Sequence, residues 1–344
     1  MLKHILFSIC VATTMAFNSS DCFSSGHEKW LCRYMDRHSK IYSSHADFLL
    51  RKIKLEQALV KRGHGDVSFG PTSRSDIFDA EKQNNNALKL KRHKFMVRRS
   101  DIKHKNLEQS ARHPIDWRNY NGIGYTTDVK DQGTCGGCFA FAAASVLEFW
   151  STLKHGHPKS LSAQNILDCT SGTNRPNVGC DGGLMEYVFE YAKHHPIVLD
   201  TDSPFKESLQ QCPRKKLWSH VAVENYRVLM IDDNPKAESQ FEHILHKYGP
   251  ISVGVDSSNM DDYRNGIFQA SMCSNDIDHA VTIVGYTKDA WIVKNSWGTG
   301  WGDGGYFYLE RGKNACGVAE YAVYVELGHE ILNKMPTHWS FTPT

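Results

Sequence analysis

The stretch that decides the fold reads Gln132-Gly133-Thr134-Cys135-Gly136-Gly137-Cys138-Phe139-Ala140-Phe141. Two glycines lead directly into a cysteine, and that cysteine begins an apolar segment. Apolar residues recur in this segment with the spacing of one helix face, at Ala142, Val146, Phe149, Trp150 and Leu153. Lys154 and His155 followed by Gly156 are typical of a helix end. The sequence therefore predicts a helix that begins at Cys138 and ends before Gly156.

Cys138 would lie at the N-terminus of this helix, where unsatisfied backbone N–H groups and the helix dipole favour a thiolate. It is therefore a candidate nucleophile. The pair Cys135-Gly-Gly-Cys138 could instead be a thioredoxin-type redox pair or half of a zinc site. Those sites need a surrounding βαβ unit or a second Cys/His pair at zinc spacing, and the sequence lacks both. The nucleophile interpretation is therefore favoured.

Composition is that of an ordinary globular protein, with 344 residues, 40% hydrophobic, 23% charged and a formal net charge of +2. The length allows two folded units, and the charge argues against a nucleic-acid partner. Residues 1–16 are typical of a secretory signal peptide, because Lys3 and His4 precede the apolar run Ile5–Val11 and small residues follow. The run is shorter than the ~20 residues of a membrane span. We expect entry into the secretory pathway and no membrane partner.

The ten cysteines suit an oxidising compartment. Cys10 lies in the signal peptide, and Cys22 and Cys32 are a candidate pair in the next segment. Seven cysteines remain, at positions 135, 138, 169, 180, 212, 273 and 316. Since seven is odd, one thiol is left outside any bridge, and a leftover thiol in a secreted protein is either an intermolecular link or reactive.

Residues 17–111 differ in character from the rest. Phe48, Leu49, Ile53, Leu55 and Leu59 lie in a charged background and predict one amphipathic helix over residues 46–61. Residues 82–105 are polar and basic, which indicates a solvated linker of the kind where proteolytic cuts concentrate. Eight of the 18 histidines lie at or before residue 113 and would gain charge in an acidic vesicle.

The chain beyond Cys138 changes from helical to β periodicity. Ser162 is a candidate cap for a helix over 163–168, and a further helix is predicted over 184–194. Short β-branched or aromatic runs predict strands at 251–255, 280–284, 291–294 and 306–309. A cleft between a helical half and a β-rich half is a usual place for a site. His279 lies at the head of one strand, 141 residues after Cys138, and Asn295 follows another.

From Pro114 to about Leu327 the sequence resembles papain-family cysteine proteases of the cathepsin L type, in which a cysteine, a histidine and an asparagine follow in this order. The motifs that carry the resemblance are Asp116-Trp117-Arg118, Val129-Lys130-Asp131-Gln132-Gly133, Cys138, Cys180-Asp181-Gly182-Gly183-Leu184-Met185, Asp278-His279-Ala280 and Lys294-Asn295-Ser296-Trp297-Gly298. Ser75–Asp79 resembles a short block of the family's prosegments.

The resemblance implies an α+β, papain-like two-domain fold, with an active-site cleft between a helical half and a β-barrel-like half and a mainly helical prosegment before it. We therefore expect a signal peptide at 1–16, an inhibitory prosegment at 17–111, a protease domain at 112–327 and an extension of unassigned role at 328–344. Processing is expected in the region 111–113, since Pro114 would protect the new N-terminus.

The resemblance also implies roles. Cys138 is the thiolate nucleophile, His279 the imidazolium that protonates the leaving amine, and Asn295 the group that orients the ring. Gln132 and the Cys138 backbone N–H form the oxyanion hole. The implied reaction is peptide hydrolysis through an acyl-enzyme, without metal or cofactor. The implied disulfides are Cys135–Cys180, Cys169–Cys212 and Cys273–Cys316, with Cys138 outside them.

Substrate specificity follows from positions that line the cleft in relatives. These are Gly182, Gly183, Leu184, Met185, Gly254, Ile277, Asp278, Ala280, Trp297 and Tyr321. Most are apolar or small, so we expect a hydrophobic side chain one position before the residue at the cut, with Tyr321 at the pocket floor. No insertion resembles the occluding loop of the exopeptidase cathepsin B, which favours an endopeptidase.

Two positions depart from the family pattern, since Gly137 and Phe139 stand where relatives usually have serine and tryptophan. The alternative function is therefore a catalytically impaired homologue that binds peptides or a partner. For the enzyme, the expected partners are peptide and protein substrates, its own prosegment and cystatin-like inhibitors. A monomer in the lysosome or outside the cell is expected.

Overall fold

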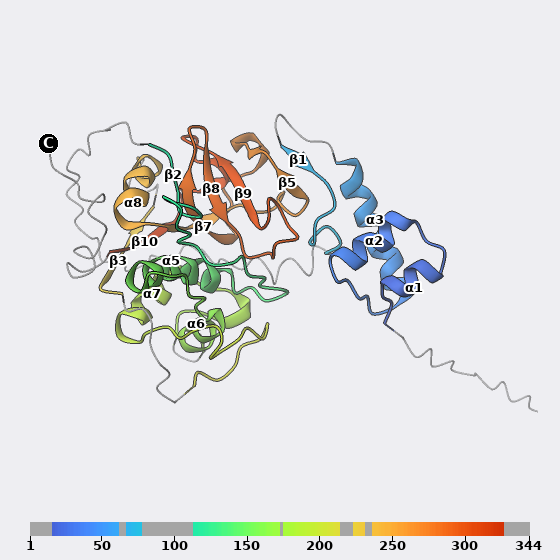
Figure 1. The fold of residues 1–344 in the computed structure, drawn as a ribbon, viewed down its shortest axis with the longest axis horizontal. Coiled ribbons are helices and arrows are strands. Elements are labelled where there is room, and N and C mark those ends of the chain that lie inside the picture. The colour runs from blue at the N-terminus through green and yellow to red at the C-terminus, as the bar shows by residue number, and fades with distance from the viewer. Residues whose placement is uncertain are drawn as a thin grey trace, which may run out of the picture.

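The computed structural model describes residues 16–61, 67–77, 113–172, 175–213, 223–230 and 236–326. The predicted signal peptide up to residue 15, the predicted linker at 82–105, the expected cut up to residue 112 and the predicted C-terminal extension lie outside the described residues. None of the helices described combines the length and apolar character that a bilayer span requires. Figure 1 shows an N-terminal group of three helices at one end of a larger body, in which helices lie along a sheet.

The helical half is built on α5, Cys138–His155, with α6, Ala163–Thr170, and α7, Met185–His194, packed against it. The predicted bounds of α5 are confirmed, because Gly156 adopts the left-handed conformation with φ of 79° that ends the helix. The predicted cap of α6 is confirmed too, since Oγ of Ser162 accepts a 2.8 Å hydrogen bond from the Asn165 N–H. A single 3₁₀ turn, Gly179–Asp181, precedes α7.

The β half is an eight-stranded sheet in the order β3-β10-β4-β7-β8-β9-β6, with β2 paired to β7. The strands are β2 Ile115–Asp116, β3 Asn225–Leu229, β4 Ile251–Val255, β6 Ile267–Phe268, β7 His279–Tyr286, β8 Ala290–Lys294, β9 Tyr306–Glu310 and β10 Ala322–Glu326. All pairings are antiparallel except β6 with β9. The four strands predicted from sequence are confirmed. Helix α8, Phe241–Tyr248, lies beside the sheet, with 3₁₀ turns at Glu238–Gln240, Ala270–Met272 and Ala315–Gly317 (Figure 1).

One hydrophobic core runs through both halves, and α5 packs directly on β7 within it. Oγ1 of Thr282 donates a 3.1 Å hydrogen bond to the carbonyl of Ala142. Ala142 is four residues past the start of α5, and Thr282 is three residues past the start of β7. This contact therefore holds the start of the helix and the start of the strand side by side.

The N-terminal segment, residues 16–77, contains α1 Ser19–Ser24, α2 Lys29–Arg37, α3 His45–Val60 and β1 Ser68–Phe69. It has a small core of its own, and Cys22 and Cys32 are joined by a disulfide inside it. β1 pairs antiparallel with β5, Tyr263–Asn265, of the β half, and the two strands lie side by side in Figure 1.

The predicted helix over 46–61 is confirmed as α3, but its predicted buried face is wrong. Phe48 and Leu55 are fully buried, whereas Leu49, Ile53 and Leu59 are 42%, 53% and 51% exposed. The small core covers only a narrow stripe of the helix, so apolar residues beside the stripe remain in solvent. Amphipathic spacing alone does not say how wide that stripe is.

Candidate active site

Cys138 is the first residue of α5 and is buried in the core. Within the described part of the chain it is the one cysteine that forms no disulfide. The structure pairs Cys135 with Cys180, so Cys135 and Cys138 are not a redox pair. The bonds Cys169–Cys212 and Cys273–Cys316 are also formed. The helix N-terminus thus carries a thiol where the dipole favours its ionised form.

His279 and Asn295 come together from two adjacent strands. His279 is the first residue of β7, and Asn295 directly follows β8. Nε2 of His279 lies 2.8 Å from Oδ1 of Asn295, and the same oxygen accepts a 2.8 Å bond from the Ser296 N–H. Since this oxygen accepts from a backbone donor, Nε2 must be the nitrogen that carries hydrogen toward it. In the neutral ring, Nδ1 is then the basic nitrogen.

Trp297 closes this pair off from water. Its ring stacks on His279 with centroids 4.7 Å apart and planes inclined by 28°. Both side chains are almost completely buried. Nδ1 of His279 is also buried and makes no hydrogen bond within the described residues. It is therefore the nitrogen left to exchange a proton with a reacting group.

Burial lowers the pKa of His279 to about 3 in the form that carries the N-terminal segment. The Asn295 hydrogen bond works in the opposite direction, and the positive charge of Arg74, from the N-terminal segment, lowers the pKa further. The ring is therefore neutral in this form. Burial and the charge of Arg74 thus both disfavour an imidazolium at this position.

Gln132 is fixed by two contacts. Its Nε2 donates a 2.9 Å hydrogen bond to the Cys135 carbonyl, and its Oε1 accepts a 2.6 Å bond from the Ser296 hydroxyl. The Gln132 N–H also donates to the Ser296 carbonyl at 2.9 Å. Ser296 thus orients both Gln132 and Asn295, a positioning role that sequence reasoning missed. Its place between Asn295 and Trp297 in the quoted motif was the available signal.

A buried ionic cluster lies behind the site, between α5 and β8. Oε1 of Glu148 lies 2.8 Å from Nζ of Lys130, and its Oε2 lies 3.8 Å from Nζ of Lys294. Burial works to raise the pKa of Glu148, but the two lysines together hold it below its ordinary value. Burial lowers the pKa of Lys294 to about 8, against the opposing effect of Glu148. Sequence reasoning missed Glu148, which lies on a helix that is apolar all round.

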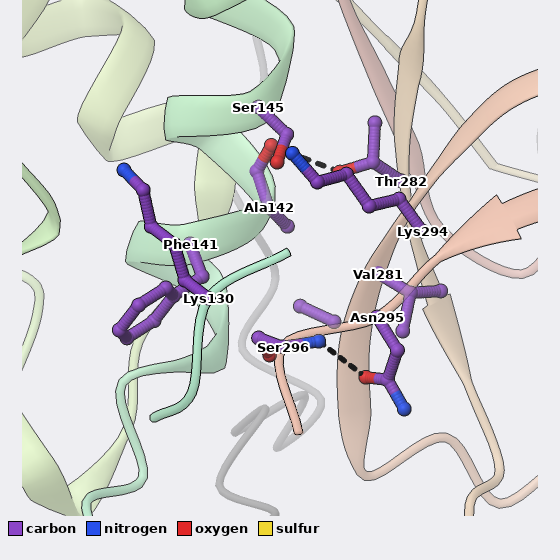
Figure 2. Close-up of a pocket in the computed structure, with 10 residues that line it drawn as sticks. Lys130, Phe141, Ala142, Ser145, Val281, Thr282, Lys294, Asn295 and Ser296 are labelled. Carbon is purple, nitrogen blue, oxygen red and sulfur yellow. Dashed lines mark hydrogen bonds between the residues drawn. The ribbon is translucent and has the colours of Figure 1, made fainter. Parts of the chain in front are cut away.

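Figure 2 shows a cavity beside this cluster, with Lys294 and Asn295 reaching in from the strand and Ala142 and Ser145 from the helix. Its dashed lines mark the hydrogen bonds of Thr282 with Ala142 and of Ser296 with Asn295. The cavity volume is about 10 Å³, which is room for one water molecule at most. It is therefore a packing feature at the back of the site.

Gly182 and Gly183 lie on the other wall, where the 3₁₀ turn leads into α7. Gly182 has a φ of 113°, which favours glycine. A Cβ on Gly183 would lie 2.5 Å from Oδ1 of Asn177 and 2.9 Å from the ring of Phe139. Phe139 is fully buried beneath this glycine. The departure from the family pattern at Phe139 is therefore accommodated inside the core, next to the expected substrate path.

Several expected pocket residues are brought together. Gly254 pairs with Ala280 in the sheet, and the Gly254 N–H donates to the Tyr321 carbonyl at 2.8 Å. The Tyr321 hydroxyl accepts a 3.4 Å bond from the N–H of Glu186, at the start of α7. Leu184 and Met185, which directly precede Glu186, are buried. Strands β4 and β7, the start of α7 and Tyr321 thus meet at one place.

Ile277 and Asp278 lie in the loop before β7 and make contacts of another kind. Cγ2 of Ile277 would lie 2.8 Å from a Cβ built on Gly317. Oδ1 of Asp278 accepts bonds of 2.9 Å from both the N–H and the hydroxyl of Ser257. Burial raises the pKa of Asp278 to about 6 despite these bonds. The contacts of these two residues hold the loop that presents His279.

The N-terminal segment covers the His279 side of the site. The Ser73 N–H donates to the Gly300 carbonyl at 3.3 Å, and its hydroxyl to the Trp297 carbonyl at 3.5 Å. Cζ of Arg74 lies 3.9 Å from the Trp297 ring centre, and its Nε is 3.1 Å from Oδ1 of Asp261. Sequence reasoning missed Arg74 and Asp261, because neither lies in a motif and they are 187 residues apart.

Asp76 belongs to the block 75–79 that resembles the family's prosegments, and it is bonded within the N-terminal segment. Its carboxylate accepts from the hydroxyls of Tyr34 at 3.0 Å and Tyr42 at 2.7 Å. Lys40 pairs with it at 2.9 Å. This block therefore stabilises the segment itself, while the residues before it reach the body formed by the helical half and the β half, residues 113–326. Residues 78 and 79 lie outside the described residues.

Residues 111–326 match the family model described as papain family cysteine protease. The chain is 37% identical to cathepsin S of Mus musculus over 221 residues, which are 62% of this chain and 63% of that protein. It is 38% identical to a cathepsin L-like protein of Caenorhabditis elegans over 220 residues, 61% of this chain and 63% of the relative. These matches thus span less than two thirds of each curated relative.

Among solved structures, the digestive procathepsin L 3 of Tenebrio molitor larval midgut superimposes with a TM-score of 0.72 at 27% identity. That match covers 87% of this chain and 98% of the other. Since it extends well beyond residues 111–326, part of the N-terminal segment has a counterpart in that proform.

Proposed function

Because the chain belongs to the papain family of cysteine proteases, we propose that it is a cysteine endopeptidase made as an inactive precursor. The observation that carries the proposal is the pair His279–Asn295, held at 2.8 Å beside a helix that begins with Cys138. A nucleophile, a base and a group that orients the base are the components that covalent peptide hydrolysis requires.

In the proposed reaction Cys138 transfers its proton to Nδ1 of His279 and attacks the peptide carbonyl as a thiolate. The Gln132 amide and the Cys138 N–H stabilise the oxyanion. His279 then gives its proton to the leaving amine as the C–N bond breaks, which leaves a thioester. Water, deprotonated by His279, hydrolyses the thioester and restores the thiol. Asn295 keeps Nδ1 directed toward the reacting atoms throughout.

The N-terminal segment is proposed to be the intramolecular inhibitor. It places Ser73 and Arg74 on Trp297, and the charge of Arg74 acts on a buried histidine whose pKa is lowered to about 3. Its removal exposes His279 to water and takes away the charge of Arg74, so the pKa rises toward its ordinary value of ~6.5. Inhibition therefore has a steric part and an electrostatic part.

For specificity, Leu184, Met185, Ala280 and Tyr321 support a preference for a hydrophobic side chain one position before the residue at the cut. All four are buried, and the contact of Tyr321 with the start of α7 supports its proposed place at the pocket floor. A peptide library is the test. Enrichment of arginine or glutamate at that position would contradict the proposed pocket.

The finer features expected from sequence belong to the same proposal. They are cleavage near 111–113, passage through the secretory pathway to the lysosome or the exterior, a monomeric mature form and inhibition by cystatin-like proteins. N-terminal sequencing of the active form tests the first, and light scattering and inhibitor titration test the last two. Fractionation of the producing cells locates the protein.

The test of the activity uses the full chain. Acidified protein is titrated with an epoxide that alkylates active-site thiols and is assayed on quenched peptides. We expect one equivalent of label, located at Cys138 by mass spectrometry, and cleavage that falls by more than about 10⁴-fold in Cys138→Ala. His279→Ala should lose cleavage to a similar extent.

Asp289→Asn is the matched control, because it changes one side chain on the turn between β7 and β8, at the opposite end of β7 from His279. It should behave as wild type. Binding of peptides without labelling or cleavage would favour the alternative, a catalytically impaired peptide-binding homologue.

A further inference from the structure

The geometry points to a second binding position in this cleft, formed by Asp261 and the ring of Trp297, which takes an arginine or lysine side chain of the substrate on the leaving-group side of the cut. The inference rests on the proposed peptidase function and adds a substrate class to it. Nothing in the sequence motifs marks Asp261, so the position is defined by the structure alone.

Arg74 of the N-terminal segment occupies this position and shows what it fits. Its guanidinium lies 3.9 Å from the Trp297 ring centre and 3.1 Å from the Asp261 carboxylate, and the side chain is only 4% exposed. A planar cation stacked on an indole and paired with a carboxylate is a recognition arrangement that a neutral side chain cannot reproduce. Nη2 of Arg74 is buried with no hydrogen-bond partner among the described residues, so this guanidinium leaves one of its donors unsatisfied here.

The position belongs to the protease half, residues 113–326, so it remains when Arg74 leaves. The turn that carries Asp261 is fixed by Met260, whose carbonyl accepts bonds from the Tyr263 N–H at 3.0 Å and from Nε1 of Trp301 at 2.9 Å. Trp301 in turn packs edge-on against Trp297 at 4.9 Å. Carboxylate and ring are thus held by one cluster of the β half.

The chemistry of His279 indicates on which side of the cleaved bond the cation-binding position lies. The histidine protonates the leaving amine, so the product that carries this amine must pass the histidine. Trp297 stacks on His279, and Arg74 contacts both Trp297 and Asp261, so Asp261 lies near the histidine. The opposite wall, at Gly183, is left for the acyl portion. A side chain that reaches Asp261 therefore belongs to one of the first residues after the cut.

Charge complementarity extends to the neighbouring residue. Asp262 pairs with Lys61 of α3 at 3.3 Å. A cavity of about 450 Å³ lies between α3 and these two carboxylates, and Lys54, Lys61 and Arg74 line it from the N-terminal side. Two adjacent acidic side chains of the protease half thus each receive a cation from the inhibitory segment. The same edge is expected to attract basic leaving groups.

The experiment uses full chain processed to its active form and peptide pairs that carry arginine or its neutral isostere citrulline at the first or second residue after the cut. Mass spectrometry confirms which bond is cleaved. We expect kcat/KM for arginine to exceed that for citrulline about tenfold in at least one pair, because a charged hydrogen-bonded pair is replaced by a neutral one. Asp261→Asn should bring this ratio close to one, while the matched control Asp289→Asn keeps it.

A binding measurement separates this inference from the proposed activity. Cys138→Ala protein, processed in trans, is titrated with the same peptides. If no peptide is cleaved by wild type but the arginine peptide still binds about tenfold more tightly than the citrulline peptide, the position stands and the proposed activity falls. If protein with Asp261 intact cleaves or binds both peptides equally well, the proposed cation-binding position is wrong. That conclusion holds whether or not the protein is a peptidase.

Discussion

The N-terminal segment and the protease half are stabilised in different ways. The segment has a small core around Phe48, Leu55 and one disulfide, and it is held on the protease half by β1, by the apolar side chains of Val67 and Phe69, and by polar contacts. Those contacts include Arg74–Asp261, Lys61–Asp262 and the bond of 2.6 Å from the Thr72 hydroxyl to the Asp261 carbonyl. The protease half instead has a continuous apolar core through both of its layers.

This difference teaches why one part can leave while the other persists. Apolar burial changes little with pH, whereas ion pairs and neutral buried histidines depend on it directly. The half-buried His38 and the buried His279, at the contact between the two regions, are thus the groups through which acid weakens that contact. Substitutions should accordingly fall into two groups, those that lower the melting temperature of the protease half and those that hasten release of the segment.

The largest loss of folding stability is expected from Glu148→Ala in the protease half. It leaves the buried Lys294 and the partly buried Lys130 without their carboxylate, and loss of one partner in a buried pair costs about 3–5 kcal/mol. Thermal unfolding of the processed protein measures it. Glu190→Ala is the control, since its exposed pair with Lys193 should contribute less than ~1 kcal/mol. Equal shifts in the two variants would show that the buried cluster does not stabilise the fold.

A smaller effect, confined to the segment, is expected from replacing Cys22 and Cys32 together by serine. The bond closes a loop with a sequence separation of 10, which corresponds to about 2–3 kcal/mol. Limited proteolysis of the full chain should show faster digestion of residues 16–77. The melting temperature of the protease half within the full chain should not change, and a change there would contradict the separation of the two regions.

Arg74→Ala should hasten release of the segment by about tenfold at a fixed acidic pH, because Asp261 and Trp297 lose their cation while water can reach the carboxylate. The time course of processing measures it. Lys52→Ala removes an exposed pair with Glu28 in the same segment and serves as control. Unchanged kinetics in Arg74→Ala would mean that β1 and Thr72 hold the segment without it.

The last expected effect is on pH dependence. Burial is the largest cause that lowers the pKa of His27, of His38, to about 4, and of His279, to about 3. His38 and His279 are therefore neutral while the N-terminal segment is bound, and the stability that this contributes is complete above ~6.5 and is lost as the pH falls toward the lowered values. Release of the N-terminal segment should accelerate by about threefold for each pH unit as the pH falls from 6.5 to 4.

Cys138→Ala protein, which cannot process itself, allows this release to be followed by its sensitivity to an added protease. His38→Gln removes one titrating group, on the face that meets Gly300, and should flatten the profile. A profile that is flat in the parent protein would exclude these histidines as the cause of acid release.

The sequence was sufficient for features that local patterns determine. The spacing of apolar residues predicted α5, and β-branched runs predicted β4, β7, β8 and β9. The resemblance supplied the approach of His279 to Asn295, which the structure places at 2.8 Å. By contrast, Arg74 and Asp261 meet across 187 positions, and no local pattern records such a pair.

Two other features depend on tertiary contacts in the same way. The buried stripe of α3 is set by how little core the segment has, and not by the apolar spacing of Leu49, Ile53 and Leu59. Glu148 is a charged residue on an otherwise buried helix, and it is stable there only because Lys130 and Lys294 arrive from distant loops and strands. Neither partner is predictable from the helix itself.

The pairing of β1 with β5 has a consequence for solubility after processing. Within the described residues β1 is the only strand partner of β5, so its departure leaves a strand edge with open N–H and C=O groups. Such edges can template intermolecular β-aggregation. This one is only three residues long, and the exposed Arg264 and Asn265 make it polar and charged. If the N-terminal segment is removed as proposed, we therefore expect the β5 edge left behind to resist intermolecular strand pairing.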